Sequence, residues 1–219
     1  MSSSLVVVER PADLTTPVAV MRALLSRPEP CFLLESVEGG ERLARWSFLG
    51  TAPSREISGS DALARLRELP RVPVAAGVDL PPFTGGAVGY AGYDFVRRLE
   101  RLPGKNPDTL GLPDTWFGVF EDVVAFDHVK HRLLFIAHAE EGCEEAARVR
   151  LAKLAAFVAN APGSTPPPRI GGDFEESLPR AAYVDAVEKA KEHIRAGDIF
   201  QVVLSRRWTT RIEGDPFPV

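Results

Sequence analysis

Cysteine is scarce in this chain of 219 residues, and that scarcity excludes several kinds of protein. The two cysteines, Cys31 in an apolar run and Cys143 in a helical segment, are far apart in the sequence. They have neither the spacing of a metal-binding motif nor the number that a disulfide-stabilised scaffold needs. We therefore expect a protein of a reducing compartment, the cytoplasm.

An excess of charge of one sign is also lacking. The chain has 26 Lys and Arg residues against 30 Asp and Glu residues, for a net charge of -4, and the two signs are interspersed. No basic face is expected for nucleic acid or for an anionic membrane. The apolar run near the amino terminus, residues 5–8, is too short for a signal peptide or a membrane span. We expect neither nucleic acid nor a membrane as a partner.

Phosphate-binding motifs are missing from the most glycine-rich segment, PPFTGGAVGYAGYDFVRRLERLP at residues 81–103. It lacks the Lys-Ser/Thr pair of a P-loop and the glycine spacing of a dinucleotide-binding fingerprint. We interpret it as a strand whose glycines allow another backbone or a large side chain to approach closely. A short helix is expected to follow at residues 93–99.

A histidine cluster raises the question of a metal site. His128, His131 and His138 lie around a predicted hairpin turn, but no cysteine or carboxylate stands beside them at the spacing of metal ligands. The pattern favours a surface hairpin over a metal centre.

The secondary-structure signals that are present indicate an α+β fold. Short apolar runs predict strands at residues 5–8, 31–34, 116–120, 123–126 and 133–137, whereas capping residues and helical periodicity predict helices that begin near residues 17, 61, 140 and 179. Because tight turns join several of the strands, we expect largely antiparallel sheets with covering helices. The hydrophobic content of 45% suffices for a core.

The first hairpin is the clearest candidate for a binding site. Glu35 and Ser36 follow the apolar run 31–34 and precede a turn at Gly39-Gly40. A carboxylate and a hydroxyl at the edge of an apolar surface can bind the amino group of a ligand. Alternatively, Ser36 satisfies the backbone of the turn, and Glu35 pairs with Arg42 or Arg45.

A second candidate is Gln201, a polar residue inside the apolar run 199–204, which we predict to be a buried strand. An unpaired buried amide costs on the order of 1 to 3 kcal/mol, so Gln201 requires hydrogen-bond partners. Either a neighbouring backbone or a ligand in an active site can supply them.

The region around residues 160–172 is rich in proline and is expected to be a linker between two domains. Beyond it only about fifty residues remain, too few for a substantial core. Asp215-Pro216 has the pattern of a helix start. We therefore expect the sequence to be a fragment of a longer protein.

Four segments together resemble the amino-terminal part of anthranilate synthase component I: FLLESVEGGERLARWSFLG, GGAVGYAGYDFVRRLERLP, VAFDHVKHRL and YVDAVEKAKEHIRAGDIFQVVLSRRW. The resemblance implies the fold of chorismate-utilising enzymes and a lyase of tryptophan biosynthesis that forms anthranilate and pyruvate from chorismate and ammonia. It also implies magnesium as cofactor, a glutamine amidotransferase subunit (component II) that supplies the ammonia in a hetero-oligomer, and feedback inhibition by L-tryptophan.

The same resemblance assigns roles to residues. Leu34, Glu35 and Ser36 match the family's tryptophan-binding motif, with the serine in contact with the effector. Gln201 stands where water-using relatives carry a lysine that activates water. A neutral amide is no general base, so Gln201 is expected to line the active site without transferring protons.

The resemblance also implies a domain organisation. Residues 1–159 match the regulatory, tryptophan-binding domain, residues 160–172 the linker, and residues 173–219 the beginning of the chorismate-binding catalytic domain. The family's catalytic histidine and magnesium-binding glutamates belong to the carboxy-terminal half, which is missing here. No catalytic or metal-binding residue is therefore expected in this chain.

Two other interpretations remain open. Component I of aminodeoxychorismate synthase, of the folate pathway, has the same fold and the same glutamine, although the complete LLES motif and the GYDFVRRLE segment favour anthranilate synthase. The chain is alternatively a tryptophan-binding module without catalytic activity.

Overall fold

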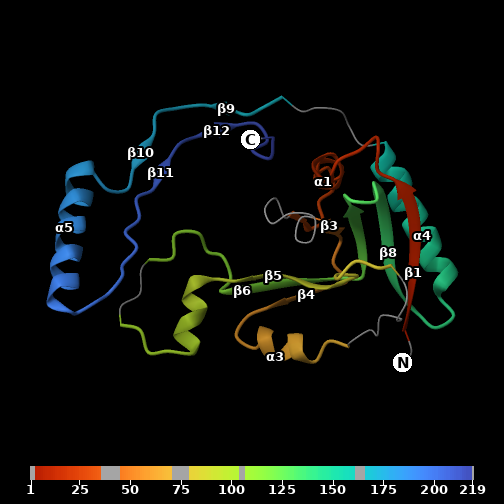
Figure 1. Ribbon diagram of the computed structural model, residues 1–219, viewed down its shortest axis with the longest axis horizontal. Coiled ribbons are helices and arrows are strands. Elements are labelled where there is room, and N and C mark those ends of the chain that lie inside the picture. The colour runs from red at the N-terminus through yellow and green to blue at the C-terminus, as the bar shows by residue number, and fades with distance from the viewer. Residues whose placement is uncertain (1–2, 36–44, 71–78, 104–106, 161–165, 219) are drawn as a thin grey trace. The chain divides into compact units, whose positions relative to one another are not determined.

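The computed structural model describes residues 3–35, 45–70, 79–103, 107–160 and 166–218 (Figure 1). The chain divides into two compact units, Met1–Gly163 and Ser164–Val219. This division falls inside the proline-rich stretch.

The described residues of the first unit form two antiparallel sheets. The larger sheet has five strands in the order β1 (Ser3–Pro11), β8 (Arg132–Glu140), β7 (Asp122–Asp127), β3 (Trp46–Thr51) and β2 (Cys31–Glu35). The smaller sheet has three strands in the order β4 (Arg55–Ser58), β6 (Thr115–Phe120) and β5 (Gly86–Ala91). The predicted α+β class with largely antiparallel sheets is confirmed.

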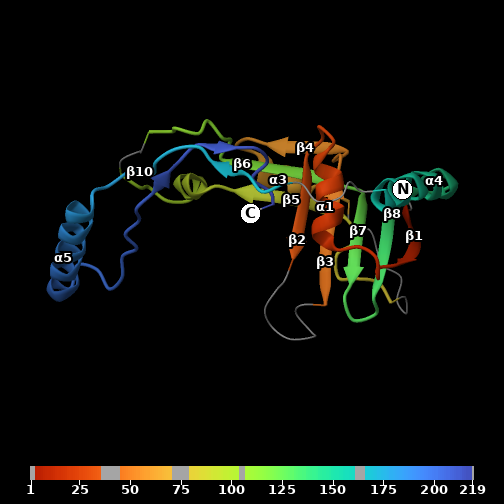
Figure 2. The ribbon, with the colours of Figure 1, turned by 90° about the horizontal axis from the view of Figure 1, so that it is seen from above.

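The two faces of the five-stranded sheet have different neighbours. Alternate residues of a strand point to opposite faces, so the register divides the apolar side chains into two sets. Helices α1 (Pro17–Leu25) and α4 (Glu144–Ala159) contact the sheet on one face and also contact each other (Figure 2). The opposite face carries a buried cluster of Ala125, Leu134 and Ile136. Both faces therefore contribute to the core.

Helix α1 begins as the sequence predicts. The side chain of Thr16 accepts a hydrogen bond from the backbone N–H of Ala19 at 3.1 Å, and Pro17 occupies the first helical position. Its buried stripe contains Val20 and Leu24. Val18 lies off this stripe and is 44% exposed.

The described part of this unit also contains the helix α3 (Ala62–Arg67) and the 3₁₀ helix η1 (Tyr93–Arg98). The predicted start of α4 at residue 140 is wrong, because β8 continues through Glu140 and the chain then turns at Gly142, whose φ is +85°. Among the described residues no helix is long and apolar enough to cross a membrane.

Close packing explains the glycines of β5. Gly89 is paired with Phe117, and a Cβ atom on Gly89 would lie 2.0 Å from the carbonyl oxygen of Trp116 and 2.5 Å from the Cα of Phe117. The interpretation of this segment as a strand approached by another backbone is confirmed.

The second unit is a long helix with two short ladders. Helix α5 (Arg180–Ala196) ends at Gly197, whose φ is +80°. Strand β10 (Glu175–Glu176) pairs with β11 (Trp208–Thr209), and β9 (Arg169–Ile170) pairs with β12 (Ile212–Glu213).

The prediction of a buried strand at residues 199–204 is wrong. This segment belongs to no strand, and Phe200 and Val203 are 94% and 81% exposed. An apolar run becomes a buried strand only where a neighbouring strand and a covering layer are available. The described residues of the second unit provide neither.

Candidate functional site

The predicted effector residues lie at the end of β2, which is an edge strand of the five-stranded sheet. Leu34 pairs with Phe48 and Glu35 pairs with Ser47. Because they are neighbours in a strand, their side chains point to opposite faces of the sheet. Leu34 is 49% exposed and Glu35 is also exposed. A single ligand that touches both side chains therefore has to lie at the end or along the edge of this strand.

Ser36, Arg42 and the glycine turn lie outside the described residues. The alternative pairing of Glu35 with Arg45 is wrong, because Arg45 forms its ion pairs with Asp127 and Asp79. Glu35 has no ion pair within the described part of the chain.

Aromatic rings line the face of the sheet on which Leu34 lies. The rings of Trp46 and Phe48 stack with their centroids 6.4 Å apart, and Phe48 meets Phe83 edge-on at 5.6 Å. Phe32 continues the row with Phe120 at 4.7 Å, where a glycine at position 50 leaves room for its ring. Such a row is a rigid apolar surface next to the exposed Leu34.

A buried carboxylate fixes the start of β3 to its neighbours. Asp127, at the end of β7, accepts hydrogen bonds from Nε and a terminal nitrogen of Arg45 at 2.9 Å and 2.6 Å, and from Arg132 at 3.2 Å. Arg132 and Lys130 also pair with Asp79. Arg45, the residue immediately before β3, is thus held to Asp127 by two hydrogen bonds that its guanidinium donates.

Burial alone would raise the pKa of Asp127, since its side chain is fully shielded from solvent. Hydrogen bonds from Arg45, the backbone N–H of Lys130 and Arg132 outweigh this effect and lower the pKa to about 2. Asp127 is therefore ionised at neutral pH and acts as a structural anchor.

Ser47 and His128 form a second polar contact near Glu35. The Ser47 hydroxyl lies 2.7 Å from Nε2 of His128, whose ring stacks on Phe126. Ser47 is buried, and it lies opposite Glu35 in the register. Neither this pair nor Asp127 is predicted by the sequence, because residues about eighty positions apart come together only through the pairing of β3 with β7.

The other histidines have separate structural roles. His131 occupies the turn after β7 with a φ of +49°, and Nε2 of His138 lies 2.9 Å from the carbonyl oxygen of Thr84. No three metal-binding side chains among the described residues lie close enough together to hold an ion.

Gln201 is exposed and lies in irregular backbone of the second unit. The cysteines are both free thiols: burial raises the pKa of Cys31, and Cys143 is exposed.

A comparison against protein families identifies the family of the chain. The family described as chorismate binding enzyme matches residues 29–219, and the chain belongs to this family.

Comparison with individual proteins shows which members of this family the chain is similar to. The chain is 41% identical to anthranilate synthase component 1 of Thermus thermophilus over 94% of its own length and 47% of that protein's. The crystal structure of anthranilate synthase component I from Streptococcus pneumoniae matches with a TM-score of 0.65 and 30% identity, over 84% of this chain and 45% of that one. The menaquinone-specific isochorismate synthase of Escherichia coli, at 12% identity and a TM-score of 0.51, shares the fold. The chain thus spans about half the length of the curated relatives it matches.

Proposed function

We propose that the chain is part of component I of an anthranilate synthase, a lyase that forms anthranilate and pyruvate from chorismate and ammonia. The observation that carries the proposal is the 41% identity with the Thermus thermophilus protein of that name over 94% of the chain. The 30% identity with a structural relative of the same name supports it.

A genetic experiment distinguishes this function from its runner-up. Deleting the gene in its own organism should create a requirement for tryptophan that added anthranilate relieves. A requirement for 4-aminobenzoate would instead assign the chain to aminodeoxychorismate synthase. Growth without either supplement, in an organism with no second gene of this kind, would contradict both enzymes.

We further propose that the 219-residue chain alone does not form anthranilate. No cluster of three or more His, Cys, Asp or Glu side chains is found among its described residues, and the family resemblance assigns the catalytic histidine and the metal ligands to the carboxy-terminal half of the family's proteins. When bound, magnesium would support elimination from chorismate; its ligands are expected in that other part. The purified chain, given chorismate, ammonium and magnesium, should produce no anthranilate fluorescence, and efficient turnover would contradict this proposal.

L-Tryptophan is the proposed effector, and its proposed binding site is at the end of β2. Leu34 lies beside the aromatic row, which suits an indole ring, and the free carboxylate of Glu35 suits an ammonium group. Ser36 is included from the family resemblance. Feedback inhibition then requires that tryptophan bind one arrangement of the enzyme more tightly than another.

The prediction for this site concerns Glu35→Gln in the native protein that contains this chain. Loss of the carboxylate should weaken tryptophan binding by about tenfold, since a hydrogen bond to a charged group is worth roughly 1.5 to 3 kcal/mol. Calorimetric titration measures the affinity, and Glu29→Gln, an exposed carboxylate just before β2, is the control. Equal affinity in the wild type and Glu35→Gln would remove Glu35 from the site.

The proposed partner is a glutamine amidotransferase, component II, in a cytoplasmic hetero-oligomer. The name "component 1" of the relatives supports a multi-component enzyme. Affinity purification of the tagged native protein should recover an amidotransferase. Tight tryptophan binding by the isolated 219-residue chain, without such a partner, would instead favour the non-catalytic binding module.

A further inference from the structure

Five apolar side chains of the first unit are exposed in the segment that joins β5 to β6. Each of them is between 42% and 86% exposed, and we call this set the η1 surface: Tyr93, Leu99, Leu102, Leu110 and Leu112. Strands β5 and β6 are antiparallel neighbours, so the segment leaves and re-enters the three-stranded sheet at the same end (Figure 1). The η1 surface therefore belongs to one end of this sheet.

Hydrogen bonds hold this segment in place. The backbone N–H of Gly92 donates to the carbonyl oxygen of Asp114 at 2.7 Å and closes the segment at its base. The guanidinium of Arg97 donates to the carbonyl oxygen of Leu102 at 3.2 Å, and Arg98 pairs with the carboxylate of Asp114 at 3.4 Å. The apolar side chains are thus carried by backbone that its own neighbours fix.

The chemistry of the η1 surface is that of a protein contact. Apolar side chains gain free energy when a contact removes them from water, about 1.5 to 3 kcal/mol for a fully buried leucine. Two ion pairs accompany them, Asp94 with Arg97 and Arg98 with Asp114. An exposed apolar surface with polar residues at its rim is typical of a site where polypeptide docks.

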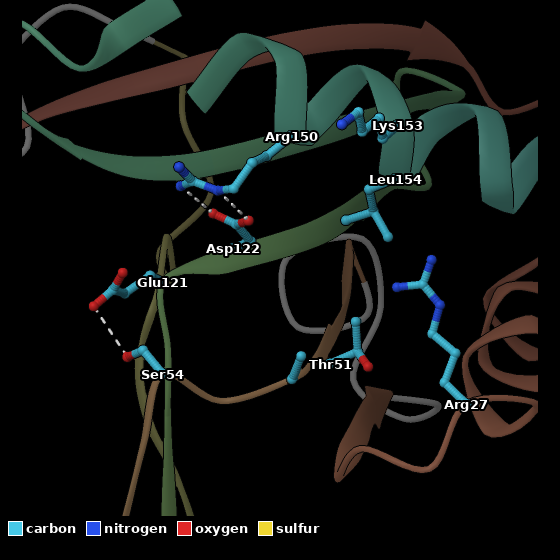
Figure 3. A pocket seen from close by; sticks show the side chains of 9 residues that line it. Arg27, Thr51, Ser54, Glu121, Asp122, Arg150, Lys153 and Leu154 are labelled. Carbon is cyan, nitrogen blue, oxygen red and sulfur yellow. Dashed lines mark hydrogen bonds and ion pairs between the residues drawn. The ribbon is translucent and has the colours of Figure 1, made fainter. Parts of the chain in front are cut away.

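A recess elsewhere in the first unit has a different chemistry. This hollow of about 460 Å³ is lined largely by charged and polar side chains from the end of α1, the turns after β3 and β6, and α4 (Figure 3). Asp122 pairs with Arg150, and Glu121 accepts a hydrogen bond from the Ser54 hydroxyl, so both carboxylates of the wall already have partners. Because such a wall is well solvated, the η1 surface is the better candidate for a protein contact.

We propose that the η1 surface is covered in the native protein by polypeptide of the same component I chain that lies outside these 219 residues. This inference rests on the proposed function, under which the chain is part of a longer component I. The chain covers 47% of the Thermus thermophilus relative and 45% of the Streptococcus pneumoniae structure, so each of these proteins has about as much polypeptide again. Permanent contacts are more apolar than transient ones, and four leucines and a tyrosine therefore suit a contact within one polypeptide better than a separable subunit.

Hydroxyl-radical footprinting tests the contact by comparing the 219-residue chain with the native protein in the absence of component II. Tyr93 and Leu110 should be oxidised severalfold more slowly in the native protein, whereas Leu14, which is fully exposed in the same unit, should be oxidised at the same rate. Unchanged rates at Tyr93 and Leu110, or equal slowing at Leu14, would overturn the proposal. Slowing that requires component II would assign the surface to the partner and overturn it as well.

Polar substitutions provide a second readout. The double variant Leu110→Ser, Leu112→Ser should leave the melting temperature of the 219-residue chain unchanged, because both side chains are exposed there. In the native protein it should lower the melting temperature by roughly 4 °C or more, since two buried leucines are lost. Leu14→Ser is the matched control and should change neither. An unchanged melting temperature of the native double variant would overturn the proposal.

Neither readout depends on catalysis, so failure of this inference is distinguishable from failure of the proposed function. The mass of the native protein is measured first. A mass of 23.9 kDa, that of the 219 residues alone, would remove the covering polypeptide and overturn the inference at its premise. A larger protein that leaves the η1 surface exposed would overturn the inference and leave the proposed function standing.

Discussion

Asp127 is the buried carboxylate of the charged cluster near the proposed effector site. Its carboxylate is shielded from solvent and joins the start of β3, through Arg45, to the start of β8, through Arg132. Removing one member of a buried ion pair leaves the others desolvated and unpaired, which is more costly than losing a surface pair.

The first prediction is that Asp127→Asn lowers the free energy of unfolding by about 3 kcal/mol at neutral pH. Urea denaturation of the purified chain measures it. Asp94→Asn is the control, because Asp94 and Arg97 form a partly exposed pair within η1, and ion pairs in contact with solvent contribute roughly 0 to 1 kcal/mol. Equal effects of the two substitutions would show that the buried cluster contributes no more than a surface pair.

The second prediction concerns pH. The folded-state pKa of Asp127, about 2, lies below the ordinary value of 3.8, so its ionisation stabilises the folded state above pH 3.8 and ceases to do so as the pH falls toward 2. The shift corresponds to about 2 kcal/mol. The stability difference between wild type and Asp127→Asn should therefore shrink across this interval in acid titrations followed by circular dichroism. A constant difference would contradict the assigned ionisation.

For single residues, the sequence predicts which ones are candidates for a binding site better than it predicts which side chains contact one another. The segment ending in Leu34 and Glu35 stands out because polarity changes abruptly at a strand end, and the structure places both residues there. The contact of Arg45 with Asp127 depends on how β3 and β7 align, and a shift of one residue would put the side chains on opposite faces. No local pattern contains that information.

Among the elements, helix α1 and strand β5 follow from local chemistry. Thr16 and Pro17 mark the helix start, and the glycines of β5 mark a close backbone approach. The run at residues 199–204 shows the limit of such reasoning. Apolar content does not create a strand unless a neighbour is present to pair with it.

The third prediction is that Thr16→Ala destabilises the first unit by about 1 kcal/mol, since the N–H of Ala19 loses its side-chain acceptor. Thermal unfolding measures the change. Thr15→Ala should have a smaller effect, because the contact seen for Thr15 is made by its backbone N–H, which the substitution keeps. The reverse order would place the helix cap elsewhere.

The fourth prediction is that Gly89→Ala destabilises the three-stranded sheet by about 1 to 3 kcal/mol, because the new methyl group would overlap the backbone of β6. Gly172→Ala, where a Cβ would meet nothing within 4 Å, serves as the comparison. Denaturant titration that finds both variants equally stable would contradict the close approach.

At the scale of the whole molecule, the alternation of apolar residues and the tight turns were enough to predict antiparallel sheets with covering helices. They could not predict the order β1-β8-β7-β3-β2, because that order joins the first strand of the chain to one more than a hundred residues away. The fold is shared with an isochorismate synthase and therefore does not specify a reaction. Membership in the chorismate binding enzyme family adds information about the function that the fold alone does not give.

The most direct test of the proposed function is to identify the product made by the native protein, purified from its own organism through a tag on this gene. With chorismate, ammonium and magnesium, mass spectrometry should detect anthranilate and pyruvate in equal amounts, and L-tryptophan should suppress both. Aminodeoxychorismate as the product, or no consumption of chorismate, would contradict the account.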